Sequence, residues 1–170
     1  MCDLVLLSFH LFLSSITFEG IDITIAQKII DWNLKRYPKG VFFLFGAGRL
    51  SLCRAQPKRA IEYYDKAMQS QSQYRNLHHI SVWESAVANM ALWDIPASLK
   101  CWKVLMAEST WSKAIYTYGL AVCMLEAGKE KDDQEAAKYM QKVPELRQKF
   151  AGKSIPLEVR CDGCSLTTRS

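Results

Sequence analysis

Residues 41–68 read VFFLFGAGRLSLCRAQPKRAIEYYDKAM, and small and bulky residues alternate along them at helical spacings. Counted from Val41, Gly48 is the eighth residue, Ala60 the twentieth and Tyr64 the twenty-fourth. Gly48 and Ala60 are small, so two helices that carry them can approach closely, while Tyr64 is large enough to fill the wedge between neighbouring helical pairs. Glycine inside a helix costs roughly 1 kcal/mol relative to alanine, which indicates a close contact that offsets the loss. The stretch therefore predicts a hairpin of two packed helices.

The same arrangement recurs along the chain. An alanine followed one turn later by a bulkier residue occurs four times, at intervals of 34, 37 and 39 residues: Ala26 with Ile30, Ala60 with Tyr64, Ala97 with Cys101, and Ala136 with Met140. This spacing resembles the tetratricopeptide repeat, and no stretch alternates apolar and polar residues for long enough to predict a sheet. We predict an all-α solenoid of about four antiparallel hairpins: 3–17 with 22–36, 41–54 with 57–70, 74–91 with 94–107, and 110–127 with 132–149.

Helix ends are marked by residues that suit them. Asp22 and Asp94 are predicted N-caps, because a carboxylate can accept hydrogen bonds from the free N–H groups of a first helical turn. Gly128 follows a periodic stretch, as a C-terminal cap does. Pro144 falls inside the last expected helix, so it should end or kink that helix near Val143.

The composition is that of one soluble globular unit, with 170 residues of which 49% are hydrophobic and 23% charged. A chain of this kind can bury a sizeable core, which excludes a disordered, a collagen-like and a disulfide-stapled small protein. The formal net charge is +5, but no basic run of the kind found in nucleic-acid-binding arms is present. The six cysteines follow no disulfide framework, so reduced thiols and a cytoplasmic location are expected.

The apolar stretch Leu4–Phe18 could be taken for a signal peptide or a membrane span. It follows Asp3 rather than a basic segment, contains His10 and lacks a small-residue cleavage pattern. It is also shorter than the roughly twenty apolar residues that cross a bilayer comfortably. We therefore expect a buried first helix and no transmembrane segment.

Four short motifs bear on catalysis or cofactor binding: Cys161-Asp-Gly-Cys164, Gly152-Lys-Ser154, Gly46-Ala-Gly48 and His78-His79. The cysteine pair lacks two further zinc ligands nearby, and the second motif lacks the first glycine and the strand of a phosphate-binding loop. The paired glycines lack the third glycine of a dinucleotide site. Adjacent histidines point about 100° apart on a helix, so they cannot readily chelate one metal. We predict no enzyme, no cofactor and no metal site.

Longer runs match one family: Leu34-Lys-Arg-Tyr-Pro-Lys-Gly40, Phe45-Gly-Ala-Gly-Arg49, Tyr74-Arg-Asn-Leu-His-His79, Trp111-Ser-Lys-Ala114 and Ala151-Gly-Lys-Ser-Ile-Pro-Leu-Glu158. They resemble the C-terminal portion of the tetratricopeptide repeat protein 39 family, its C member most closely. The resemblance covers residues 4–158 and implies a domain at 1–158 that is a fragment of a longer architecture, followed by a divergent, flexible tail at 159–170. It also implies a role in cilium assembly through protein partners, while other members imply a role in lipid homeostasis.

The inner face of a stack of helical hairpins is the candidate binding site. In a tetratricopeptide array, the second, fifth, ninth and twelfth residues of each first helix share this face. The residues predicted to bind a protein partner there are Phe45, Arg49, His79, Asn89, Lys113 and Tyr116. Arg49, Asn89 and Lys113 would clamp a peptide's backbone or carboxylates, with Phe45 and Tyr116 as apolar anchors. Two alternatives stay open, a groove filled by another segment of the same chain and a lipid held in an apolar cavity between helices.

Overall fold

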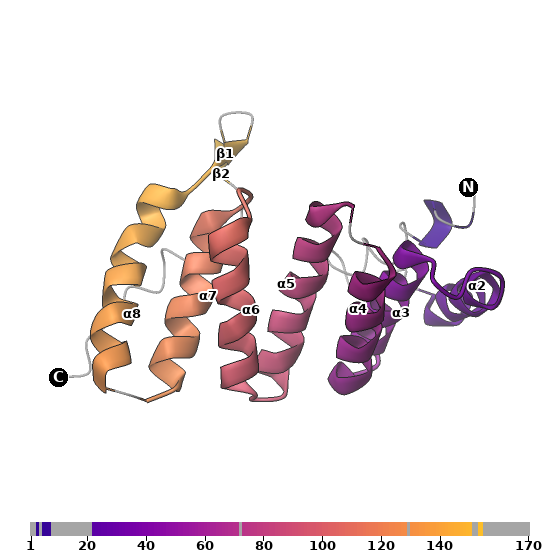
Figure 1. The fold of residues 1–170 in the computed structure, drawn as a ribbon, viewed down its shortest axis with the longest axis horizontal. Helices are drawn as coiled ribbons and strands as arrows, with labels where there is room; N and C mark the ends of the chain where they lie inside the picture. The colour runs from indigo at the N-terminus through magenta and orange to yellow at the C-terminus, as the bar shows by residue number, and fades with distance from the viewer. Residues whose placement is uncertain are drawn as a thin grey trace. The chain divides into compact units, whose positions relative to one another are not determined.

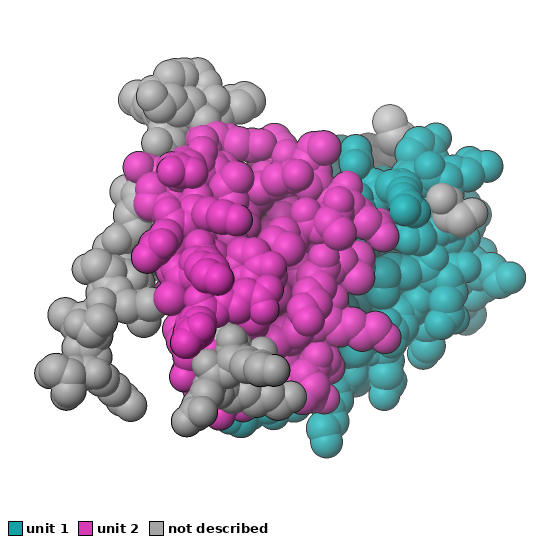
Figure 2. All heavy atoms as spheres, turned by 60° about the vertical axis from the view of Figure 1, so that its left-hand side comes forward, with its two compact units in different colours: residues 1–93 teal, residues 94–170 magenta. Residues whose placement is uncertain are grey.

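The computed structural model describes residues 3, 5–7, 22–71, 73–128, 130–150 and 153–154. The chain divides into two compact units, Met1–Trp93 and Asp94–Ser170, which are described separately below (Figure 2). The elements of the first unit are α2 (Ile23–Arg36), α3 (Val41–Cys53), α4 (Pro57–Ser70) and α5 (Arg75–Ala91). Those of the second are α6 (Ile95–Glu108), α7 (Lys113–Glu126), α8 (Glu130–Lys142), the 3-10 turn η1 (Val143–Leu146) and the two-residue strands β1 (Lys149–Phe150) and β2 (Lys153–Ser154).

The helices of the first unit pack in chain order, α2 on α3, α3 on α4 and α4 on α5. In Figure 1, α2 is seen end-on while α4 runs up the page, so α2 lies across the direction of α4. The apolar core at this end is formed by Leu7, Ala26, Ile30, Ala47 and Leu50. The predicted hairpin at residues 41–68 is confirmed, since α3 and α4 are close neighbours and Ala60 and Tyr64 are both buried.

The second unit consists of α6 packed on α7 and α7 packed on α8. Small or apolar residues of α7, such as Ala114, Leu120 and Ala121, are buried at these contacts. The segment after η1 is attached to the turn before α7, because the Gln148 side chain donates to the backbone carbonyl of Thr110 at 3.0 Å. Gln148 thereby joins the C-terminal part of the unit to the turn between α6 and α7.

The predicted helix caps are confirmed. Asp22 accepts hydrogen bonds from two backbone N–H groups of the first turn of α2, at 2.9 and 3.0 Å. Asp94 accepts one from the first turn of α6 at 3.1 Å. Gly128 ends α7 with a φ of +66°, the left-handed conformation that glycine adopts without strain.

Two other helices end in the same way without a glycine. Ala55 has a φ of +55° and Trp93 a φ of +60°, and each stands two residues after the last residue of its helix, as Gly128 does. The turn at the end of α3, α5 and α7 therefore keeps one backbone conformation while its sequence changes. Because glycine is the residue usually found at this position, the turns at Ala55 and Trp93 were not predicted from the sequence.

Near the C-terminus, the helix predicted over residues 132–149 is shorter in the structure. The α-helix ends at Lys142 and continues as the tighter turn η1, which contains Pro144, so the predicted break near Val143 is confirmed. Beyond it, β1 and β2 form a two-residue antiparallel ladder, although no sheet was expected from the sequence. Most of the expected first helix and all of the tail at 159–170 lie outside the described residues.

Candidate protein-interaction site

In the first unit, the candidate site is built around the contact between Gly48 and Tyr64. A Cβ atom at Gly48 would lie 2.4 Å from Cε1 of Tyr64, closer than two carbon atoms can approach, so only glycine fits. Phe45, one turn before Gly48, lies with its ring 5.6 Å from that of Tyr64 at a tilt of 44°. The expected close approach of α3 and α4 therefore occurs where the Tyr64 ring packs against the backbone of Gly48.

Arg49, the residue after Gly48, forms an ion pair with Glu84 of α5 through Nη1 and Oε1. The Arg49 side chain is 23% exposed, whereas that of Glu84 is only 9% exposed. Burial raises the pKa of Glu84, and the positive charge and hydrogen bond of Arg49 oppose that rise. The predicted carboxylate clamp therefore already holds a carboxylate of its own chain.

The hydroxyl of Tyr64 lies beside this ion pair. It approaches the Glu84 carboxylate without completing a hydrogen bond of good geometry. Burial is the main cause that raises the pKa of Tyr64, and the negative charge of Glu84 adds to it. Tyr64 consequently spans the contact that the sequence predicted, since its ring lies on Gly48 of one hairpin and its hydroxyl faces α5 of the next.

Other residues of the expected inner face differ in how open they are. Phe42 is the second residue of α3, one of the positions that the repeat spacing puts on the inner face, and it is 52% exposed although its side chain is wholly apolar. His79 of α5 is half-buried, and Asn89 near the end of the same helix is buried at 8% exposure. The most accessible apolar group on this face is therefore Phe42, which lies one turn before Phe45.

In the second unit, Lys113 begins α7 and is half-buried, while Tyr116 is buried. The Tyr116 ring lies 6.4 Å from that of Trp102 at a tilt of 35°. Burial raises the pKa of Tyr116, and a hydrogen bond with Ser109 opposes the rise. A Cβ atom at Gly119 would lie 2.7 Å from Cε2 of Trp102, so this glycine too is required by an aromatic ring.

The structure therefore places the six predicted residues in two sets. Phe45 and Arg49 share one face of α3, with His79 and Asn89 on α5 of the same unit, while Lys113 and Tyr116 belong to the other unit. That all six form one binding surface stays a prediction.

Glu84 was missed in the sequence, although a signal was present. It is the single charged residue between Ile80 and Ala91, and a carboxylate in an apolar helix needs a partner of opposite charge. Arg49 stands 35 residues earlier, about one repeat, so it occupies an equivalent level of the preceding hairpin. Repeat spacing combined with charge would have paired the two residues.

The described residues of three of the motifs considered for chemistry lie in helices or in the short ladder. The Gly46–Gly48 run is inside α3, Lys153 and Ser154 form β2, and His78 Nε2 donates to the backbone carbonyl of Gln71. Across the described ranges, no group of three or more His, Cys, Asp or Glu side chains is placed to hold a metal ion. Cys161 and Cys164 lie outside the described residues. None of the described helices is long and apolar enough to cross a membrane.

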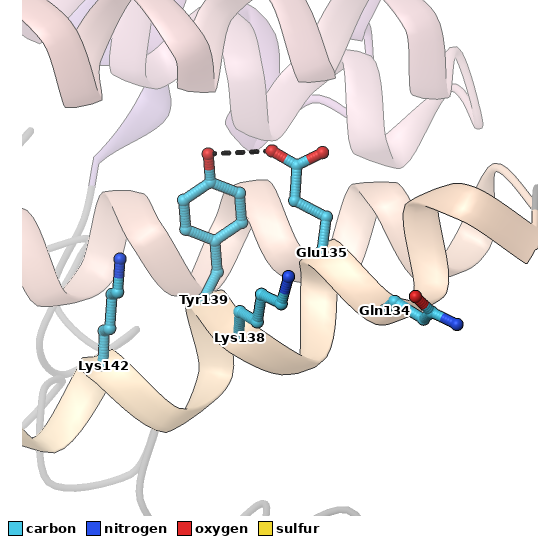
Figure 3. A pocket seen from close by; sticks show the side chains of 5 residues that line it. All are labelled: Gln134, Glu135, Lys138, Tyr139 and Lys142. Carbon is cyan, nitrogen blue, oxygen red and sulfur yellow. Dashed lines mark hydrogen bonds between the residues drawn. The ribbon is translucent and has the colours of Figure 1, made fainter.

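A hollow of about 440 Å³ runs along α8. The described residues that line it are Gln134, Glu135, Lys138, Tyr139 and Lys142, and Figure 3 shows them side by side on one helix. Tyr139 donates a hydrogen bond to Glu135 at 3.2 Å. These lining groups do not converge from separate elements, so they provide no catalytic arrangement.

Comparison with solved structures supports the fold. The crystal structure of MamA protein matches with a TM-score of 0.63 and 17% sequence identity, covering 85% of this chain and 73% of that chain. Together with the packed helical hairpins, this likeness places the chain among the α-helical repeat proteins, which confirms the predicted all-α repeat class.

A sequence model of the family Iml2/Tetratricopeptide repeat protein 39 matches residues 1–161. Tetratricopeptide repeat protein ttc-39B of Caenorhabditis elegans is 31% identical over 169 residues. The chain belongs to the Iml2/Tetratricopeptide repeat protein 39 family, as the longer sequence runs indicated. The match covers 95% of this chain but only 28% of the nematode relative, so the chain spans about a quarter of that protein's length.

Proposed function

We propose that the chain is a non-catalytic scaffold that binds a protein partner through the exposed face of α3. One observation carries the proposal: Phe42 is 52% exposed and stands three residues before Phe45 and seven before Arg49, so all three share one helical face. Aromatic and arginine side chains dominate the binding energy of many protein interfaces. An accessible phenylalanine beside an arginine is the arrangement expected at the centre of such an interface.

The ion pair with Glu84 gives Arg49 a different part from the one first predicted. Because Glu84 is the more buried partner, it fixes the guanidinium in place and neutralises its charge. Arg49 therefore has a fixed position on this face, while the exposed Phe42 and the half-buried Phe45 supply apolar contact. A partner with an apolar side chain at its centre suits this surface better than a strongly acidic peptide.

The test compares two exposed aromatic residues of the same unit. Phe42→Ala removes the proposed anchor, whereas Tyr74→Ala removes a residue that is 66% exposed and stands just before α5. Both variants are first checked for native helix content by circular dichroism. Each variant and the unaltered chain are then used to capture proteins from a lysate of ciliated cells, and the captured proteins are quantified by mass spectrometry. Phe42→Ala should lose a defined set of proteins that Tyr74→Ala retains, and equal recovery by both variants would show that this face of α3 is idle.

A role in cilium assembly is the finer part of the proposal, supported by the resemblance to the C member of the family. It expects the proteins lost with Phe42→Ala to be components of the ciliary assembly machinery. A lipid-handling role is the alternative, supported by the resemblance to other members. Extraction of lipid from the purified chain separates the two, because a protein scaffold should come away empty.

A further inference from the structure

The outer side of α2 and the turn that follows it form a second exposed surface. It contains four cations and two aromatic residues, all exposed: Lys28, Trp32, Lys35, Arg36, Tyr37 and Lys39. We call this set the basic-aromatic surface. None of its members belongs to the proposed partner-binding face of α3.

The rotation of α2 is fixed by the side that it buries. Ala26, Ile30 and Asn33 face the core, and the Asn33 side chain donates to the backbone carbonyl of Ile29 at 2.9 Å. At 100° per residue, Lys28 and Trp32 project from the opposite side of the helix. The core packing of α2 therefore turns the basic-aromatic surface toward solvent.

The turn continues this surface beyond the helix. The backbone N–H of Tyr37 donates to Asn33 at 2.7 Å, and that of Gly40 donates to Tyr37 at 2.9 Å. Arg36 lies 5.9 Å from the centre of the Tyr37 ring, so a cation and an aromatic ring are held together. Tyr37 and Lys39 are thus held next to the end of α2 by a hydrogen-bonded turn.

Charge is concentrated at this surface. Residues 1–93 contain ten Lys and Arg and seven Asp and Glu, whereas residues 28–39 contain four and one. The rest of that unit is balanced, with six of each, so residues 28–39 hold its whole positive excess. Among the described residues, Lys28, Lys35 and Lys39 form no salt bridge that would neutralise them.

We propose that the basic-aromatic surface docks on an anionic membrane surface. Lysine and arginine are attracted to acidic lipid headgroups, and tryptophan and tyrosine rings favour the headgroup level, where one side is apolar and the other hydrated. Trp32 is 62% exposed, which leaves its ring available to enter that layer. The helix lies on the membrane without spanning it, and its inner side stays packed in the protein core. This differs from a lipid held in a cavity between helices.

The membrane fits the surface better than the other occupants. A second copy of this chain would bring the same positive charges together, which is repulsive. A nucleic acid would satisfy the charges, but Ile25, also exposed on this side of α2, has no role in binding phosphates. An anionic bilayer provides both a negative surface and an apolar layer beneath it.

The whole chain is tested by sedimentation with vesicles of phosphatidylcholine, either pure or with about 30% phosphatidylserine. The chain should bind the anionic vesicles at least tenfold more tightly than the neutral ones, and added salt should weaken that binding because the charges lie at the surface. Lys35→Ala with Arg36→Ala should weaken binding about thirtyfold, given the usual contribution of each basic residue near an anionic membrane. Trp32→Ala should weaken it about fivefold, because its ring no longer enters the interface.

Matched control variants distinguish binding by this surface from a general effect of lost positive charge or of a lost exposed aromatic ring. Lys100→Ala with Lys103→Ala removes two exposed lysines of α6, and Trp93→Ala removes a tryptophan that is 70% exposed. Both controls should bind the anionic vesicles as tightly as the unaltered chain. All of the changed residues are exposed, and circular dichroism confirms that each variant keeps its helices.

Three outcomes overturn the proposal. The first is equal binding to neutral and anionic vesicles, and the second is an equal loss in the control variants. The third is a preference for another occupant: a short duplex DNA bound in place of vesicles, or a dimer in analytical ultracentrifugation that Trp32→Ala abolishes. The tests do not involve Phe42, so the proposed partner-binding face of α3 stands or falls separately.

Discussion

The two units place an aromatic ring on a helical glycine, but from opposite directions along the chain. In the first unit, Gly48 of α3 is covered by Tyr64 from the helix that follows, whereas in the second, Gly119 of α7 is covered by Trp102 from the helix that precedes. In both, the residue three positions before the glycine is aromatic and contacts the covering ring, Phe45 in one and Tyr116 in the other. One packing arrangement thus accepts a ring from the following helix in the first unit and a ring from the preceding helix in the second.

The residue after the glycine makes the difference between the two regions. Arg49 follows Gly48 and forms the ion pair with Glu84, while Leu120 follows Gly119 and is buried. A charged pair must be held in place at the first contact, and only apolar packing is needed at the second. The glycine and the ring therefore set how closely the helices pack, while the next residue sets the chemistry of the contact.

The largest expected effect comes from filling the glycine positions. Gly48→Ala should lower the free energy of unfolding by about 3 kcal/mol, because the new Cβ meets a ring that is itself buried, and overpacking of this kind outweighs the gain in helix propensity. Gly119→Ala should cost less, about 2 kcal/mol, since its Cβ would lie 2.7 Å from Trp102 instead of 2.4 Å from Tyr64. Urea denaturation followed by circular dichroism measures both values. A neutral or stabilising result for either alanine would show that the ring can move away from the new Cβ atom, so that the glycine is not required there.

Removing the ion pair from either side should have unequal effects. Arg49→Ala should cost about 2 kcal/mol of unfolding free energy, because it leaves the more buried partner, Glu84, without its counter-charge. Glu84→Gln should cost only about 1 kcal/mol, because Arg49 is partly exposed and can turn toward water. The same denaturation experiment provides the two values. If Glu84→Gln were the costlier change, burial of the Glu84 carboxylate would not be the reason why the ion pair matters for stability.

Much of this arrangement could be predicted from the sequence because it depends on local chemistry. The capping residues Asp22 and Asp94 act within a few residues of their own position, and a proline such as Pro144 ends an α-helix whose interior it would otherwise occupy. The approach of Tyr64 to Gly48 was also predictable, because it follows from residue size at a known spacing within one hairpin.

The partners and burial of the site residues could not be predicted, because they depend on which side chains of neighbouring helices contact each other. The repeat spacing gives only the positions on the inner face. The predicted clamp of Arg49, Asn89 and Lys113 did not include Glu84, because this partner of Arg49 lies on another helix, 35 residues further along the chain. Asn89 was expected to be open from its position in the repeat, yet it is buried. Size and propensity are properties of one residue, whereas pairing and burial are properties of the packed structure.

The charged contact should also make stability depend on pH. Burial raises the pKa of Glu84, so the folded chain binds this proton more tightly than the unfolded chain does. The free energy of unfolding therefore falls as the pH rises from the pKa of Glu84 in the unfolded chain to its raised pKa in the folded chain. The stabilisation that comes from protonated Glu84 is fully present only below the pKa of the unfolded chain. Urea unfolding measures the free energy of unfolding of the unaltered chain and of Glu84→Gln across this pH interval. The unaltered chain should lose stability relative to Glu84→Gln as the pH rises. A difference that is constant with pH would show that Glu84 titrates as it does in the unfolded chain.

The smallest expected effect lies in the turns that end α3 and α7, where the residue in the left-handed conformation is alanine in one unit and glycine in the other. Ala55 has a φ of +55° and Gly128 a φ of +66°, a backbone conformation in which a Cβ is strained. Ala55→Gly should therefore stabilise the chain by about 0.5 kcal/mol, since relief of strain exceeds the added flexibility of the unfolded chain. Gly128→Ala should destabilise it by about 1 kcal/mol, because nothing lies within 4 Å of its Cβ position to compensate. Thermal unfolding of the two variants should shift in opposite directions, and a shift in the same direction would mean that the two turns are not equivalent.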